Sequence, residues 1–345
     1  MKGLIGFVCI IIALCFYLSF GTGGSPHSNI LLGVRLPAGV LKEQEVIELA
    51  RRFKKANRSI FFVFIVLALP MLKLEYPSLL LLYMMVWCLL YYIAGNWCFL
   101  NYFDRILLMK SKNHWFPGDC HELTVEKGKV NEVKGMRKLY RRLFPDRRER
   151  LMRRTEGPVY VDEDEYWING YYDNPWDNHK SIEKRVGIGT TMNMAYKRNR
   201  WISFLAFASM VLFMGGLVIL LFKFDFATFR INIGKDEITI DAPVYKEHFK
   251  TRDMVEVAIT EVLPKEGLRT GGVATSRYYL GNFNLDQYGK SRVYLYIQHL
   301  PYLVIHLKDR TILFNTKSRE QTLEYYRQLA YLIEDNKILI KSSVK

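Results

Sequence analysis

The sequence predicts an α+β protein with a four-helix integral membrane region, a basic cytoplasmic loop and a C-terminal β domain that ends in one helix. Three observations lead to this prediction. Half of the 345 residues are apolar, and four apolar runs approach the length of a membrane span. The formal net charge is +15, and the last third of the chain alternates apolar and polar residues in short stretches.

The apolar runs predict four membrane-spanning helices. They are Leu4 to Phe20, Ser59 to Leu74, Leu79 to Trp97, and Trp201 to Phe222. The last two approach the ~20 residues that a helix needs to cross ~30 Å of hydrocarbon, and the first two lie near the lower limit. The first run also resembles a signal peptide, but no Ala-x-Ala site follows it, so we expect it to be retained. Residues 1–100 thus form a membrane region with three helices, and residues 201–223 form the fourth.

The distribution of Lys and Arg predicts the sidedness of the chain. These residues collect between 101 and 200 and in the stretch that precedes the second run. Basic stretches close to membrane helices stay in the cytoplasm, and two helices separate these two, so both belong on that side. We expect a multi-pass protein of the cell membrane whose residues 101–200 are cytoplasmic, with the N-terminus and the C-terminal domain outside. Anionic lipid headgroups are the expected partners of the basic residues.

The stretch between the first two runs contains the sequence GVRLP. Gly33 permits a tight turn, Pro37 prevents a helix from continuing into it, and residues 43–55 have the apolar spacing of an amphipathic helix lying on the inner membrane face. The pattern made by Asn29, Gly33, Arg35 and Pro37 resembles a motif of SdpI-type bacterial membrane proteins. The Trp-bearing helix usual in that group after the proline is missing here. The resemblance implies a role in toxic-peptide immunity or envelope stress.

A second motif, residues 166–201, precedes the fourth run and resembles a segment of bacterial membrane proteins of unknown function. The candidate positions are Trp167, Gly170, Asn174, Pro175, Asp177, Lys184, Arg185, Gly187, Gly189 and Asn193. Asn-Pro followed by Asp predicts a turn, and Gly-x-Gly beside two cations is compatible either with a phosphate site or with contact to anionic lipid. We favour the lipid contact, because the strand and helix of a nucleotide fingerprint are missing.

Between the motifs, the basic stretch around residues 135–155 predicts an amphipathic helix on the membrane surface. Its apolar stripe, which Pro145 interrupts, consists of Met136, Leu139, Tyr140, Leu143 and Phe144. No recognition fold accompanies the basic residues, so nucleic acid is not an expected partner.

Residues 226–345 predict a β domain. Seven strands and a helix from Ser318 to about Asp335 follow the order of a pleckstrin-homology (PH) barrel, and stretches such as GNFNL and TILFN are similar to the bacterial PH-type family. The resemblance implies a PH-like barrel capped by one helix, without implying phosphoinositide binding. The first hairpin mixes Arg230 and Lys235 with three acidic residues, so we expect the domain to bind a protein or peptide partner and not a lipid headgroup.

The aromatic residues of three consecutive strands extend this prediction. Alternation should bury about half of them and leave the others as an interaction surface. The residues are Tyr278, Tyr279, Phe283, Tyr288, Tyr294, Tyr296 and Tyr302.

The sequence gives few signs of catalysis. His114, Cys120, His121 and Glu122 lie close together, but a metal site needs a second pair of ligands, and an ordinary loop is expected. We predict no catalytic residues, no metal site, no cofactor and no disulfide framework. The favoured function is a non-enzymatic membrane protein that binds a partner in immunity or envelope stress. The alternative is a membrane enzyme or transporter acting on a lipid or small molecule, which charged residues inside the runs would favour.

Overall fold

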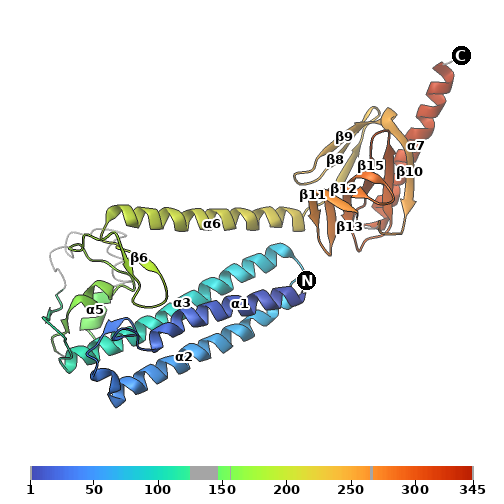
Figure 1. Cartoon of the computed structure of the whole chain (residues 1–345). Helices are drawn as coiled ribbons and strands as arrows, with labels where there is room; N and C mark the ends of the chain where they lie inside the picture. Colours follow the sequence, from blue (N-terminus) through green and yellow to red (C-terminus); the bar gives the residue numbers. More distant parts are fainter. Residues whose placement is uncertain (1, 125–146, 156, 265–266, 344–345) are drawn as a thin grey trace. The chain divides into compact units, whose positions relative to one another are not determined.

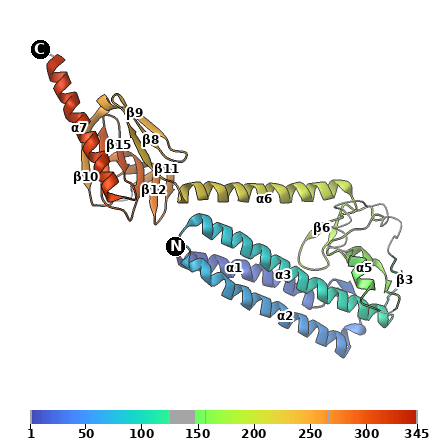
Figure 2. The same ribbon diagram turned by 180° about the vertical axis from the view of Figure 1, so that it is seen from behind.

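The computed structural model describes residues 2–124, 147–155, 157–264 and 267–343 (Figures 1 and 2). The chain divides into two compact units. Unit 1 comprises Met1–Leu74 and Leu79–Gly216, and unit 2 comprises Glu75–Ser78 and Leu217–Lys345. Each unit is described by itself.

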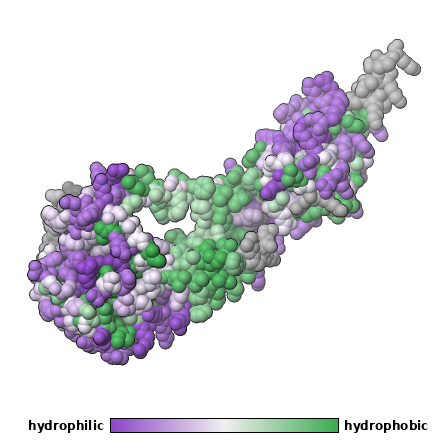
Figure 3. All heavy atoms as spheres, in the orientation of Figure 1, coloured by the Kyte–Doolittle hydropathy of each residue, from purple (hydrophilic) through white to green (hydrophobic). Residues whose placement is uncertain are grey.

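Among the described residues, four helices are long and apolar enough to cross a membrane, which supports the prediction of a multi-pass membrane protein. They are α1 (Lys2–Gly21), α2 (Gln44–Ala68), α3 (Pro77–Lys112) and α6 (Lys197–Asp225). Helices α1, α2 and α3 lie side by side in both ribbon views, and apolar side chains cover their outward surface in Figure 3. Outward-facing residues such as Phe7, Phe62 and Leu89 are more than half exposed, as expected for side chains that meet lipid.

The helix predicted at residues 43–55 is present, but its predicted position on the membrane face is wrong. It is the first half of α2, which continues without a break into the second apolar run. Its buried residues Val46, Leu49 and Phe53 pack in one core with Phe103 and Leu107 of α3. The stripe is therefore covered by protein. Helix α3 ends at Lys112, fifteen residues beyond its predicted end at Trp97. Its additional turns pack in the same core.

Polar groups between the first three helices are bonded to the backbone. The Trp87 indole donates to the carbonyl oxygen of Phe64 (2.9 Å), and the Tyr91 hydroxyl donates to that of Ala13 (3.2 Å). Each donor thereby finds an acceptor away from water, as a membrane interior requires.

The loop between α1 and α2 folds together with the segment that follows α3. The loop contains two short strands, β1 (Ile30–Leu31) and β2 (Val34–Arg35). The later segment contains β3 (His121–Glu122), α5 (Arg147–Met152), β4 (Tyr160–Val161), the 3₁₀ helix η5 (Glu163–Trp167), β5 (Ser181–Glu183) and β6 (Thr190–Met192). Leu32 and Val34 of the loop share a core with Val161 and Ile168 of the segment. The basic stretch before α2 and the basic segment after α3 therefore pack together. This agrees with the prediction that both belong on the same side. Most of the predicted amphipathic helix lies outside the described residues.

Unit 2 contains two sheets and a helix. Strands β7 (Arg230–Ile233), β8 (Glu237–Asp241) and β9 (Glu247–Lys250) form an antiparallel sheet. A six-stranded sheet has the order β10-β14-β15-β13-β12-β11. Its strands are β10 (Met254–Thr260), β11 (Leu268–Ala274), β12 (Tyr278–Leu285), β13 (Gly289–Tyr296), β14 (Tyr302–Leu307) and β15 (Thr311–Phe314), and α7 (Arg319–Ser343) follows.

The predicted closed barrel is not found among the described strands. The strands form two sheets, and β14 lies on the far side of β15, so that β13 pairs with β15 in parallel. Strands that follow one another in the chain are therefore not all neighbours in the sheet, and not all pairs are antiparallel. Two of the nine strands, β9 and β11, were not predicted, because EHFK is short and LRTGGVA contains two glycines.

The prediction of an exposed aromatic surface on this domain is also wrong. Tyr278, Tyr294 and Tyr296 lie in the core that includes residues of both sheets and α7. Residues that alternate with them, Tyr279, Phe283 and Tyr302, lie in a second core cluster, and Tyr288 is partly buried against it. Both faces of the six-stranded sheet are buried, so alternation does not leave one aromatic face for a partner.

The connector Glu75–Ser78 between α2 and α3 belongs to unit 2 and is bound there by polar contacts. The buried Asp225 carboxylate accepts hydrogen bonds from the Ser78 amide (2.7 Å) and the Tyr278 hydroxyl (3.0 Å). Arg277 pairs with Glu75 (2.9 Å) and lies over the Tyr76 ring. These contacts hold the connector within unit 2.

Packing between α1 and α3 generates a prediction at Gly95. A Cβ atom there would lie 2.4 Å from the Phe20 ring, whereas one at Gly215 of α6 meets nothing within 4 Å. We expect Gly95→Ala to destabilise the protein by about 1–3 kcal/mol through overpacking, and Gly215→Ala to be neutral or slightly stabilising. Thermal unfolding in detergent measures both, and adding Phe20→Ala should restore part of the loss. Equal midpoints for the two glycine variants would contradict this packing.

Candidate functional site

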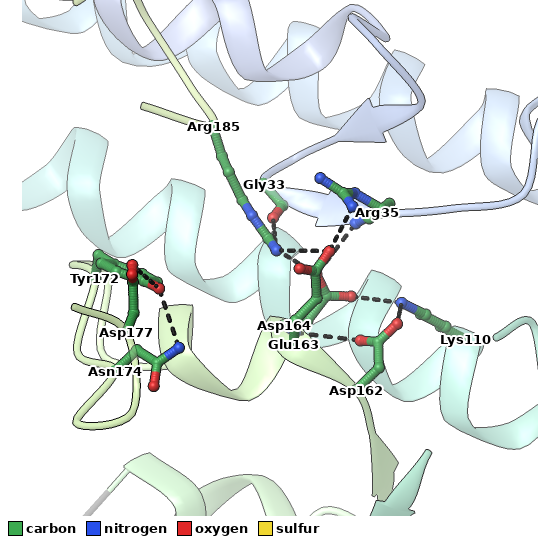
Figure 4. Close-up of polar contacts among 10 residues, drawn as sticks. All are labelled: Gly33, Arg35, Lys110, Asp162, Glu163, Asp164, Tyr172, Asn174, Asp177 and Arg185. Carbon is green, nitrogen blue, oxygen red and sulfur yellow. Dashed lines mark hydrogen bonds and ion pairs between the residues drawn. The ribbon is translucent and has the colours of Figure 1, made fainter. Parts of the chain in front are cut away.

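The candidate site lies in unit 1, where the end of α3 meets the loop between α1 and α2 and the segment around η5 (Figure 4). Its centre is a set of charged side chains that we call the ion network: Lys110, Asp162, Asp164 and Arg185, with Arg35 and Glu163 at its edge. Three cations and three anions meet here, so the network has no formal net charge.

Lys110 is the most deeply buried member. It follows Ile106 and Leu107 on the buried face of α3, and its side chain is fully buried. Its ammonium nitrogen lies 2.6 Å from an oxygen of Asp162 and 2.6 Å from an oxygen of Asp164 (Figure 4). Two charge-assisted hydrogen bonds therefore replace the water that this cation loses on burial.

Asp164 connects the two sequence motifs. Its carboxylate accepts hydrogen bonds from the Arg185 guanidinium and from the backbone amide of Arg35 (3.2 Å). Arg185 also donates to the carbonyl oxygen of Gly33 (3.1 Å), and its guanidinium lies over the Trp167 ring. Gly33 has φ +85°, a conformation that glycine adopts without strain. The GVRLP turn and the second motif thus meet on one carboxylate.

The local sequence explains how two carboxylates converge on one lysine. Asp162 precedes η5, and its side chain accepts a hydrogen bond from the Asp164 amide (3.1 Å), as an N-cap residue does. The cap fixes the backbone between them and leaves one oxygen of each carboxylate for Lys110.

Burial and the neighbouring charges act in opposite directions on these carboxylates. Burial raises the pKa of Asp164, against the opposing charges of Arg185 and Lys110. Burial also acts to raise the pKa of Asp162, but the hydrogen bond and the charge of Lys110 outweigh it, so the pKa of Asp162 is lowered. The network therefore depends on its buried members, because removing one of them leaves an uncompensated buried charge.

A second set of polar contacts holds the turn predicted at DNPWDN. The Tyr172 hydroxyl donates to Asp177 (2.8 Å) and accepts from the Asn174 side chain (3.0 Å). Asn193 is fully buried and bonds both the amide and the carbonyl of Asn174 (3.0 and 2.7 Å). Burial raises the pKa of Tyr172 to about 12, so its proton stays in place at neutral pH. Hydrogen bonds from the backbone and side chain of His179 lower the pKa of Asp177.

Beside the ion network lies a polar cleft of about 310 Å³. Arg35 and Glu163, which form an ion pair of 2.7 Å, are about half exposed at its edge. Its lining residues are His27, Ser28, Ile30, Arg35, Glu163, Tyr166, Trp167, Tyr172, Asn174, Ile182, Glu183, Lys184 and Arg185. We refer to this space as the polar cleft.

The remaining motif residues shape the backbone around the site. Gly170, Gly187 and Gly189 all have positive φ angles, as does Asn29, whose carbonyl accepts from the Leu36 amide. Pro37 ends the turn after β2, and Pro175 lies exposed in the loop fixed by Asn174. None of these six residues lines the polar cleft.

Sequence reasoning missed Lys110, Asp162, Glu163 and Asp164. Two signals were present in the chain. Lys110 occupies the position that continues the buried stripe of Ile106 and Leu107, and the acidic run DEDE lies just before the second motif. A cation on an apolar stripe requires a buried anion, and this acidic run supplies one.

The residues considered for catalysis do not assemble into a metal site. Cys120 and His121 are exposed, and His121 lies 3.3 Å from Glu165. Within the described part of the chain, no group of three or more His, Cys, Asp or Glu side chains is placed to hold a metal ion.

The chain matches no protein-family model, no curated protein and no solved structure. The SdpI-type and PH-type resemblances therefore stay predictions that rest on the motifs.

The ion network predicts a strong effect of Lys110→Met. The substitution keeps the length of the side chain but leaves two carboxylates facing Arg185 alone, and we expect a loss of about 3–5 kcal/mol. Lys112→Met, two residues further along at an exposed position, is the matched control and should change stability by less than about 0.5 kcal/mol. Thermal unfolding of the detergent-solubilised protein measures both. Adding Asp162→Asn to Lys110→Met should recover part of the loss; a double variant as unstable as Lys110→Met would argue against the network.

Proposed function

We propose that the chain is a non-enzymatic multi-pass protein of the cell membrane that acts by binding a protein or peptide partner in the polar cleft. In this proposal residues 101–200 and the loop before α2 are cytoplasmic, and the C-terminal domain lies outside. The PH-like character of residues 226–345 belongs to the same proposal. It is supported by β-sheets that share a core with a C-terminal helix.

The observation that carries the proposal is the convergence of the two motifs. The carbonyl oxygen of Gly33 accepts from Arg185, and the amide of Arg35 donates to Asp164, although about 130 to 150 residues separate the partners in the sequence. A buried network of this kind is a weak source of stability, because desolvation offsets most of the Coulombic gain. Its best-supported effect is to fix one arrangement, here the relative positions of the loop and the η5 segment around the cleft.

The chemistry of the polar cleft favours a peptide over a polyanion. Arg35 and Lys184 are accompanied by Glu163 and Glu183, so a multiply charged anion would meet repulsion as well as attraction. Tyr166 and Trp167 add aromatic surface beside arginine, a combination enriched at the energetic centres of protein interfaces.

We no longer propose a partner site on the C-terminal domain. The tyrosines expected to form a surface there are buried or partly buried in its cores. A toxic peptide or an envelope protein is the partner class that the SdpI-type resemblance implies, and its docking site is now the polar cleft.

Arg35→Ala tests partner binding. The Arg35–Glu163 pair is about half exposed, and such pairs contribute only ~0–1 kcal/mol to stability, so folding should survive. Purification from mild detergent, with partners identified by mass, should then show loss of a partner that the unmodified protein retains, with its affinity reduced about tenfold or more. Arg52→Ala, which removes an exposed i,i+4 pair with Glu48, is the control and should retain the partner. If the two variants retained the partner equally, the proposed binding of the partner in the polar cleft would be wrong.

Cysteine labelling tests the proposed sidedness. Single cysteines at Lys235 and Lys180, in a background with Ser at the exposed Cys15 and Cys120, are treated with an impermeant reagent in intact cells. We expect labelling at position 235 alone, and at position 180 only after the cells are opened. Labelling of position 180 alone in intact cells would reverse the orientation.

A further inference from the structure

A second cleft of unit 1 opens over the helices on another side of Trp167 and Arg185. Its volume is about 450 Å³. One wall consists of aromatic residues of α1 and α3, among them Phe16, Phe20, Tyr92 and Phe99, and the other wall comes from the segment that carries β5 and β6. We call it the amphipathic cleft, because an apolar wall faces Lys184 and Arg185.

Lys184 is the cation that this cleft offers to a ligand. Arg185 is already bonded to Asp164 and Gly33. Lys184 is exposed, and no carboxylate of the described residues forms an ion pair with its ammonium group. Its charge is thus available to an anion without breaking the ion network.

Asn96 adds a polar group where the helices are otherwise apolar. It lies inside the span of α3 and lines the amphipathic cleft. Among the residues that the structure describes, none forms a hydrogen bond with its carboxamide, whereas the neighbouring Trp87 and Tyr91 are bonded to backbone carbonyls. A polar side chain inside a span is costly unless it finds a partner, so Asn96 points to a ligand with polar atoms.

The hairpin between β5 and β6 brings apolar residues to the same region. Val186 packs near Gly23 and Phe99 at the ends of the helices. Two residues later, Ile188 is 96% exposed, between Gly187 and Gly189 with φ +84° and +101°. The exposed isoleucine side chain between the two glycines is more stable in hydrocarbon than in water. This is consistent with a hairpin tip at the bilayer interface.

We propose that the amphipathic cleft binds one anionic phospholipid of the surrounding bilayer, with its phosphate on Lys184, its glycerol or ester oxygens at Asn96 and an acyl chain along the aromatic wall. The wall is continuous with lipid-facing surface, since Tyr92 and Ile93 of α3 are each 52% exposed. This continuity favours a membrane lipid over free phosphate. The proposal does not depend on a partner in the polar cleft.

Lipid titration of the full-length protein in mild detergent, followed by native mass spectrometry, tests the proposal. Phosphatidylglycerol should bind with one molecule retained per chain, and phosphatidylcholine should bind more weakly. Lys184→Gln should lower the affinity for phosphatidylglycerol about tenfold, the loss expected for one charge-assisted contact. Lys180→Gln is the matched control, since Lys180 is exposed just before the same hairpin and does not line the cleft. It should leave the affinity unchanged.

Two further variants separate binding from folding. Asn96→Leu should weaken retention of phosphatidylglycerol without lowering the thermal midpoint, because it removes an unpaired polar group from the span. Lys184→Arg should restore the binding lost in Lys184→Gln. Inorganic phosphate should not displace the lipid, and displacement would overturn the assignment to a lipid. Equal affinities of the Lys184→Gln and Lys180→Gln proteins, or no preference for phosphatidylglycerol in the unmodified protein, would also overturn it.

Discussion

The burial of one lysine between two carboxylates is the constraint on which unit 1 depends. An ammonium group at the end of an apolar helix face loses its hydration, and Asp162 and Asp164 together compensate for that loss. Once Asp164 is held by Lys110, its other oxygen fixes Arg185 and the amide of Arg35. The loop before α2 and the segment after α3 are therefore positioned by the same carboxylate.

A related arrangement occurs at the other end of α3. There the buried Asp225 accepts hydrogen bonds from the Ser78 amide and the Tyr278 hydroxyl. In both places a buried aspartate bonds groups that are distant in sequence, and a charged acceptor makes such bonds stronger than a neutral one. Each unit thus contains a buried aspartate that joins distant segments of that unit.

The sequence predicted those features that depend on composition and periodicity. Four apolar runs gave four helices, and the distribution of Arg and Lys placed two stretches together that share a core through Val34 and Val161. Features that depend on tertiary contact were missed. The stripe of Val46 and Phe53 has the same spacing whether lipid or α3 covers it, so the sequence did not distinguish a surface helix from the start of α2.

The same limit explains the errors in unit 2 and at the site. Alternation along β12 cannot tell whether one face or both faces of a sheet are covered, and in this domain both are. At the site, the motif residues Gly33, Arg35 and Arg185 were found because of their residue types. The contacts that join Arg185 and the Arg35 amide to Asp164 cross more than 20 residues, and Lys110 pairs across more than 50, so no local pattern reveals them.

The order of residues along the chain gives the ion network a consequence for biosynthesis. Lys110 is translated about 50 residues before Asp162 and Asp164, and Arg35 more than 120 residues before them. Until the acidic run has been translated, neither cation has its partner in the ion network. Only after this run leaves the ribosome can Lys110 be buried between two carboxylates and Arg35 pair with Glu163. The order of translation therefore delays completion of the ion network until the segment after α3 has been made.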